Sequence, residues 1–168
     1  MWTKAMRPTR WGIHVLLLMT VSLISLVNAE TTVFLDSIDD CNKRHTIYNS
    51  SIVIRAHKSK VLPNPLITCN VIIDGTDNTD SNVVLEITQT SVSITDCGFV
   101  LDIYDGEDTS SSPLKSVSCW SRSTGVLYTR GKIVMFYLHR PMDLFQPTND
   151  FSMKVNVGRI EEPDDDMF

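Results

Sequence analysis

Four cysteines are the residues whose type and number point most directly to a chemical role. They are Cys41, Cys69, Cys97 and Cys119. In an exported protein, an even number of cysteines predicts a disulfide framework, and a set of four allows three ways of pairing. A zinc site is the alternative, but no two of these cysteines have the C-x-x-C spacing and the histidines are scattered along the chain. The cysteines therefore favour structural disulfides, and we expect no metal site.

No sequence pattern typical of an enzyme accompanies the cysteines. The chain has no nucleophile elbow, and no histidine lies beside a cysteine or serine in a recognisable local signature. Because all the cysteines are expected to form bridges, no thiol is left to act as a nucleophile. We therefore expect no catalytic residues, no cofactor and no enzymatic activity.

Asn49 is a candidate site of covalent modification. The tripeptide Asn49-Ser50-Ser51 is an acceptor sequon for N-glycosylation and lies in an expected loop. In an exported protein we expect Asn49 to carry a glycan, and the alternative is a plain turn asparagine.

Three groups of residues could bind a partner, and each also has a purely structural interpretation. An acidic cluster around one turn could hold a cation weakly, but we favour a solvated turn that discourages edge-to-edge association of sheets. The cluster consists of Asp102, Asp105, Glu107 and Asp108. His139 and Arg140, which end an expected strand, could form a binding edge, but we favour solvated residues at a loop entrance. Trp120 could be an exposed binding residue, but we favour packing over the neighbouring disulfide. The sequence thus leaves the binding residues unassigned.

The N-terminus predicts export. Lys4, Arg7 and Arg10 precede an apolar run over residues 11–27, which ends in small residues up to Ala29. This order is typical of a cleaved secretory signal, and the run is marginal as a transmembrane anchor, which needs about 20 apolar residues. We expect residues 1–29 to be removed. The segment carries three basic and no acidic residues, so its removal changes the net charge from −5 to −8.

The charge and the remaining sequence exclude several classes of protein. An acidic chain without a basic stripe argues against a nucleic acid partner. No second long apolar run follows the signal, so we expect a soluble, extracellular protein without a membrane span. Residues 158–168 are rich in acidic residues, include Pro163, and are expected to form a disordered tail.

The rest of the chain predicts an all-β fold. Short β-branched and aromatic runs are separated by turn residues, and residues 67, 69, 71 and 73 alternate apolar side chains onto one face. The expected strands are residues 51–56, 66–73, 83–87, 91–94, 99–104, 116–120, 125–128, 132–139 and 151–157. Strands at this short spacing indicate a sandwich or jelly roll.

Several short motifs lie before and after the cysteines in the sequence. The turn at residues 62–65, Leu-Pro-Asn-Pro, leads to Cys69-Asn70-Val71, and Cys97 leads to a strand and turn at residues 101–106, Leu-Asp-Ile-Tyr-Asp-Gly. The combination resembles the CUB domain, an extracellular β-sandwich module, over residues 41–157, with residues 30–40 as a lead-in. The resemblance implies a jelly-roll sandwich of two antiparallel sheets. It also implies sequential pairing, Cys41 with Cys69 and Cys97 with Cys119, each bridge stabilising the fold by about 3–4 kcal/mol.

The sequence departs from this family where many CUB domains bind calcium. The resemblance places the three calcium-binding carboxylates at Val92 or Ser93, at Val100 and at Arg140, and none of these residues is acidic. Calcium needs several hard oxygen ligands, so we expect no calcium at that site. Capture of a basic side chain of the partner through bound calcium is therefore also in doubt.

Two hypotheses for function follow. The first is a secreted, non-enzymatic binding module that recognises an extracellular protein or glycan through rigidly held loops. The alternative is a structural protein of the extracellular matrix or of a biomineral, whose function depends on its acidic surface. The sequence identifies no specific partner.

Overall fold

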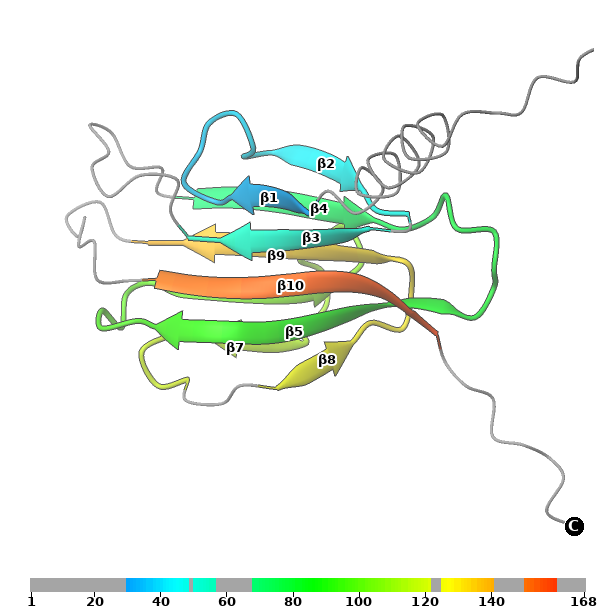
Figure 1. Ribbon diagram of the computed structural model, residues 1–168. Coiled ribbons are helices and arrows are strands. Elements are labelled where there is room, and N and C mark those ends of the chain that lie inside the picture. Colours follow the sequence, from blue (N-terminus) through cyan, green and yellow to red (C-terminus); the bar gives the residue numbers. More distant parts are fainter. Residues whose placement is uncertain (1–29, 49, 57–67, 122–124, 141–149, 160–168) are drawn as a thin grey trace, which may run out of the picture.

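The computed structural model describes residues 30–48, 50–56, 68–121, 125–140 and 150–159, which form ten strands and no helix. The strands are β1 (Thr31–Phe34), β2 (Lys43–Thr46), β3 (Ser51–Arg55), β4 (Thr68–Asp74), β5 (Val83–Ser93), β6 (Val100–Asp105), β7 (Lys115–Val117), β8 (Val126–Tyr128), β9 (Ile133–His139) and β10 (Asp150–Arg159). One sheet has the order β1-β3-β10-β5-β8, and the sheet behind it has the order β2-β4-β9-β6-β7 (Figure 1). The expected all-β sandwich is confirmed.

The core forms between the two sheets because side chains alternate along each strand. In β4, Cys69, Val71 and Ile73 are buried and face inward, as the alternation in the sequence predicts. Phe151 of β10 lies 6.0 Å from Phe99, measured between the ring centroids, and joins the two sheets. Fully burying a large apolar side chain stabilises the folded state by about 1.5–3 kcal/mol, so this interior is the main source of stability.

The sheets are antiparallel except at one edge of each. Strand β1 pairs with β3 in parallel, and β2 pairs with β4 in parallel, whereas the other pairs are antiparallel. The expectation of two purely antiparallel sheets needs this correction. Residues 30–40, expected as a lead-in, also contain a strand of the sandwich, because Thr31–Phe34 forms the β1 edge.

Strand β5 is longer than expected. The sequence suggests two strands, at residues 83–87 and 91–94, but a single strand runs from Val83 to Ser93. The polar residues between the expected strands do not end it, because β10 pairs along its whole length and a shift in register between Ser152 and Met153 absorbs the irregularity. This long pair forms the middle of the front sheet.

The outer boundaries of the domain also differ slightly from the expectation. Strand β10 continues through Gly158 and Arg159, so the last strand extends two residues into the expected tail of 158–168. The expected signal segment, Asn49, Ile67 and the rest of the tail lie outside the described residues. Within the described residues, no helix is long and apolar enough to cross a membrane.

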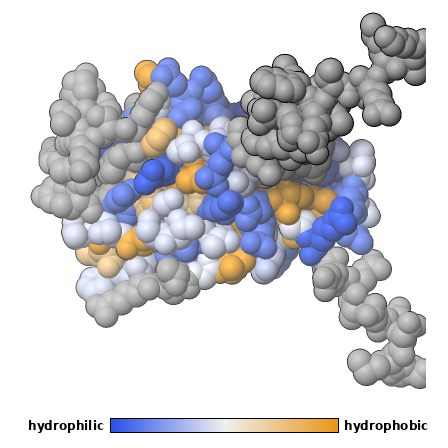
Figure 2. Space-filling model, in the orientation of Figure 1, coloured by the Kyte–Doolittle hydropathy of each residue, from blue (hydrophilic) through white to orange (hydrophobic). Residues whose placement is uncertain are grey.

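The two ends of the sandwich carry different connections. At one end, on the left in Figure 1, β1, β3, β5 and β9 finish, while β4, β6 and β10 begin. We call this end the disulfide pole and define it as the described residues 34–42, 69, 94–99, 117–121 and 139–140. The face of the front sheet shows separate hydrophobic patches among hydrophilic residues (Figure 2).

Candidate binding surface at the disulfide pole

Both disulfides lie at the same end of the sandwich. Cys41 pairs with Cys69 and Cys97 pairs with Cys119, which is the sequential pairing that the resemblance to the CUB domain implies. The Cα atoms are 5.3 Å apart in the first bridge and 4.8 Å apart in the second, within the usual range for a disulfide. The first bridge is buried, whereas Cys97 is exposed and Cys119 is half-buried. The bridges therefore fix two separate connections to the sheets at this pole.

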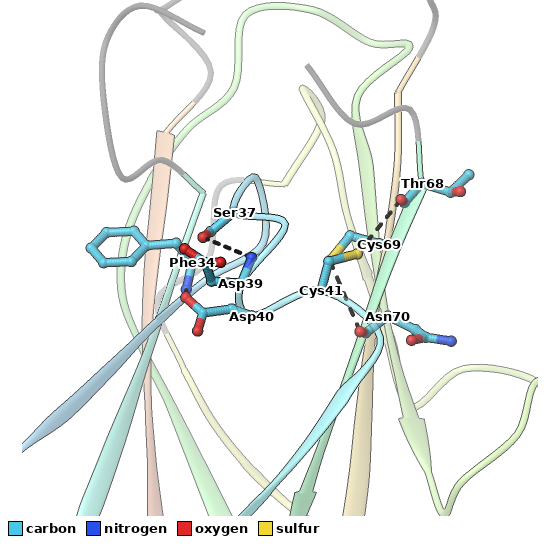
Figure 3. The surroundings of a disulfide bond; sticks show 8 residues. All are labelled: Phe34, Ser37, Asp39, Asp40, Cys41, Thr68, Cys69 and Asn70. Atoms are coloured by element: carbon cyan, nitrogen blue, oxygen red, sulfur yellow. Dashed lines mark hydrogen bonds between the residues drawn. A yellow bond between two sulfur atoms is a disulfide. The ribbon is translucent and has the colours of Figure 1, made fainter. Parts of the chain in front are cut away.

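The first connection is the loop from Phe34 to Cys41. Several of its backbone N–H groups are satisfied within the loop: the N–H of Phe34 donates to the Asp40 carboxylate at 2.9 Å, and that of Cys41 donates to the Ser37 carbonyl at 2.9 Å. The N–H of Asp39 donates to the Ser37 hydroxyl at 3.3 Å, as Figure 3 shows beside the Cys41–Cys69 bridge. These bonds and the disulfide hold the loop in one conformation.

This loop exposes Ile38. The side chain is 79 % exposed, although isoleucine is among the residues most often buried in folded proteins. Ile38 is not among the candidate residues predicted from the sequence. The available signal was an isolated apolar residue between Ser37 and Asp39, in a polar segment that ends at a cysteine.

The second connection is the turn from Ser118 to Ser121, which presents Trp120. The N–H of Ser121 donates to the Ser118 carbonyl at 2.9 Å, and the N–H of Ser118 donates to the Ser121 hydroxyl at 3.0 Å. Trp120 follows Cys119 directly and is 81 % exposed. The expectation that Trp120 packs over the disulfide is therefore wrong. The tight turn closes on itself and leaves the indole largely exposed to solvent.

Arg140 lies inside the pole instead of on its surface. Its residue exposure is 3 %, and that of Asp36 is 4 %. Burial lowers the pKa of the Arg140 guanidinium, and the negative charge of Asp36 opposes that shift. The expectation of a solvated residue at a loop entrance is wrong for Arg140, while the neighbouring His139 is exposed as expected. The attraction between the buried Arg140 and Asp36 thus links the segment after β9 to the loop after β1.

The positions that the resemblance to the CUB domain assigns to calcium ligands lie at this same end of the sandwich. Val92 and Ser93 end β5, Val100 begins β6, and Arg140 follows β9. The structure places a cationic side chain, and no carboxylate, at the third position. Among the described residues, no group of three or more His, Cys, Asp or Glu side chains could hold a metal ion.

The acidic cluster of the sequence analysis is divided among separate partners. Asp102 accepts a hydrogen bond from the Ser116 hydroxyl, and the Asp105 carboxylate accepts one from the Arg130 N–H at 3.0 Å. Glu107 forms an ion pair with Arg44 at 2.6 Å, and Asp108 accepts hydrogen bonds from Ser110. These carboxylates stabilise turns and strand ends and do not converge on a shared position.

The residues on either side of Asn49 lie at the opposite end of the sandwich. Tyr48 and Ser50 line a surface hollow of about 300 Å³ together with Asn156, Val157 and Arg159. Tyr48 is 55 % exposed. The neighbours of the predicted glycosylation site are therefore accessible to solvent and far from the disulfide pole.

Comparisons with known proteins do not assign a family. No protein-family model and no curated protein match the chain. Among solved structures, a periplasmic inhibitor of g-type lysozyme from Aeromonas hydrophila is similar, with a TM-score of 0.35, 6% sequence identity, and coverage of 79% of this chain and 100% of that chain. The pre-peptidase C-terminal domain of a collagenase from Bacillus anthracis has a TM-score of 0.34 and 7% identity, covering 78% of this chain and 96% of that chain. Similarity at this level carries no argument about function. Membership of the CUB family stays a prediction from the motifs.

Proposed function

We propose that this protein is a secreted, non-enzymatic binding module that contacts an extracellular protein or glycan through its disulfide pole. The observation that carries the proposal is the 81 % exposure of Trp120 on a turn held by a disulfide and by hydrogen bonds. Tryptophan is enriched among the residues that contribute most to binding energy. Its exposed ring adds little to the stability of the free protein, so its burial against a partner is a net gain.

The rigidity of the two connections supports the same proposal. Binding is weakened when a loop or side chain must be ordered on contact, and a turn that is already ordered avoids much of that loss. Both the Ile38 loop and the Trp120 turn are tied to the sheets by a disulfide and by internal hydrogen bonds. Recognition by loops on a fixed scaffold is the usual arrangement in β-sandwich proteins.

The spacing of the two exposed side chains suits a single interface. The Ile38 loop leads into β2, and the Trp120 turn follows β7, at opposite edges of one sheet. Four strand spacings of about 4.8 Å separate these edges, or roughly 19 Å in total. An interface that buries about 800 Å² on each partner is wide enough to include both side chains.

Two independent features support the proposal that the protein is secreted. The N-terminal segment has the charge and hydropathy order of a cleaved signal. Paired disulfides persist mainly in oxidising, extracellular environments. A glycan on Asn49, remote from the disulfide pole, is compatible with binding there.

The proposal is tested by recovering the tagged, mature protein from its native extracellular setting and identifying what is recovered with it by mass spectrometry. A parallel recovery uses the Trp120→Ala variant, and Tyr48→Ala serves as a matched control because Tyr48 is an exposed aromatic residue outside the pole. We expect a discrete, saturable partner that is lost with Trp120→Ala and retained with Tyr48→Ala.

Salt distinguishes this function from that of an acidic matrix protein. Recognition centred on apolar side chains should persist at high ionic strength and after deletion of residues 160–168. Association with matrix or mineral driven by net charge should weaken strongly under either change. Recovery that depends on salt and on the tail, and is unaffected by Trp120→Ala, would refute the proposed function.

A further inference from the structure

Strand β8 forms an edge of the front sheet, and its backbone is directed outward at two residues. The Thr129 N–H donates to the Leu85 carbonyl at 3.0 Å, and the Gln89 N–H donates to the Gly125 carbonyl at 3.1 Å. In an antiparallel pair, alternate residues bond the partner strand while the residues between them turn their N–H and C=O groups away. Val126 and Tyr128 therefore present these groups to the outer edge of β8, where no further strand lies among the residues that the structure describes.

The side chains of the same two residues form an apolar surface on the outer face. Leu127 packs against the core, so its neighbours Val126 and Tyr128 point outward. They are 47 % and 59 % exposed, respectively. A short edge strand thus combines outward-directed backbone groups with an exposed valine and an exposed tyrosine, residues that favour strands and pack well across them.

The β8 edge also lacks the charges found at both edges of the other sheet. Strand β2 contains Lys43 and Arg44, and β7 contains Lys115, whereas the three residues of β8 are all uncharged. Charged residues in edge strands are a common means of preventing strand association. The full chain has a net charge of −5, so two copies repel each other in general. Electrostatic repulsion between two copies is therefore weaker where they approach through the uncharged β8 edge than through a charged edge.

We propose that β8 is a self-association edge at which a second copy of this chain adds its own β8 in antiparallel orientation. With the two-fold axis through Leu127, Val126 of one copy lies opposite Tyr128 of the other. All the outward-directed groups of Val126 and Tyr128 then pair between the copies, which gives four backbone hydrogen bonds. Each valine also packs against a tyrosine across the strands, and the two front sheets become one continuous sheet.

This register is the one in which every β8 residue has a partner within β8. Pairing Val126 with Val126 would leave Tyr128 opposite residue 124, and pairing Tyr128 with Tyr128 would leave Val126 opposite Arg130. Only the Leu127-centred register keeps the aromatic and β-branched side chains together. The proposal is independent of the partner-binding function, because β8 contributes no residue to the disulfide pole.

The first test is sedimentation of the mature, glycosylated protein over a wide range of concentration. We expect the wild type to form dimers as the concentration rises, and a Val126→Lys/Tyr128→Lys variant to stay monomeric throughout. Tyr48→Lys is the matched control, since Tyr48 is exposed but lies outside both β8 and the disulfide pole, and it should dimerise like the wild type. A wild type that stays monomeric, or a dimer that persists in the double variant, overturns the proposal.

The second test is the register. When Val126→Cys and Tyr128→Cys variants are mixed, the proposed pairing brings the two new thiols together across the strands, and a disulfide-linked dimer should form. Either variant alone should give little cross-linked dimer, because the equivalent positions lie two residues apart along the strand. A peptide map verifies that the native bridges are intact. Cross-linking that is equal in the mixed and single samples overturns the antiparallel register.

Discussion

Removal of the Cys97–Cys119 bridge offers a quantitative test of how much the bridge beside the Trp120 turn stabilises the fold. The bridge joins the segment before β6 to the turn after β7 and lies largely outside the core, because Cys97 is exposed and Cys119 is half-buried. Replacing both residues by alanine therefore removes a crosslink while removing little buried surface. The change in the free energy of unfolding should come almost wholly from the greater freedom of the unfolded chain.

The size of that change follows from the length of the closed loop. The two cysteines are separated by 22 residues. In the chain-entropy model, a loop of this length gives a loss of about 3.4 kcal/mol at 25 °C. For Cys41→Ala/Cys69→Ala the separation is 28 residues, and the same model gives about 3.6 kcal/mol. Cys41 and Cys69 are also part of the buried core, so the total loss should be larger in this second variant.

The assay is equilibrium unfolding of the mature protein in guanidinium chloride, monitored by circular dichroism. We expect the transition of Cys97→Ala/Cys119→Ala to move to lower denaturant, and that of Cys41→Ala/Cys69→Ala to move further. A loss of this size is a large share of the 5–15 kcal/mol that stabilises a typical domain. If removal of the Cys97–Cys119 bridge left the transition where it is in the wild type, the bridge would not stabilise the fold by restricting the unfolded chain, and the expected loss would be refuted.

Three further predictions concern other parts of the molecule. Burial raises the pKa of the Asp74 carboxyl group, but hydrogen bonds from Thr76 and from Arg44 lower that pKa by more. The net pKa of Asp74 is therefore below its ordinary value. Stability should therefore fall as the pH drops below about 4, and Asp74→Asn should reduce this acid sensitivity in thermal melts. Gly75→Ala should destabilise the fold by about 1–3 kcal/mol in chemical denaturation, because the new methyl group would lie 3.1 Å from Leu85 and 3.2 Å from a backbone carbonyl. Asn49→Gln should remove the mass increment that an N-glycosidase releases from the wild type, and an unmodified wild type would contradict the predicted glycan.

The strands with clear alternation could be predicted from the sequence, because their pattern is set by the core they face. Strands β4, β9 and β10 agree with the expected ranges to within a few residues. Strands β1 and β2 were missed. They are four residues each, lie at parallel edges, and carry few apolar side chains, so their existence depends on pairing with β3 and β4 instead of on local pattern.

The candidate binding surface was harder to predict than the fold. The cysteines were recognisable as a disulfide framework from the sequence, and the resemblance to the CUB domain implied their pairing. The exposure of Trp120 depends on the closure of the turn from Ser118 to Ser121, and the burial of Arg140 depends on Asp36, more than a hundred positions away in the chain. A single sequence contains no local signal for either arrangement.

Fluorescence quenching of Trp120 tests the binding proposal most directly. Of the three tryptophans, Trp2 and Trp11 lie in the expected signal segment, so a protein produced without residues 1–29 contains Trp120 as its one tryptophan. Its emission therefore reports on the turn alone. The proposal predicts that acrylamide quenches Trp120 strongly in the free protein and weakly in the complex with the recovered partner, at low and at high salt. Quenching that is equally strong in the saturated complex would show that Trp120 stays outside the interface and would contradict binding through the disulfide pole.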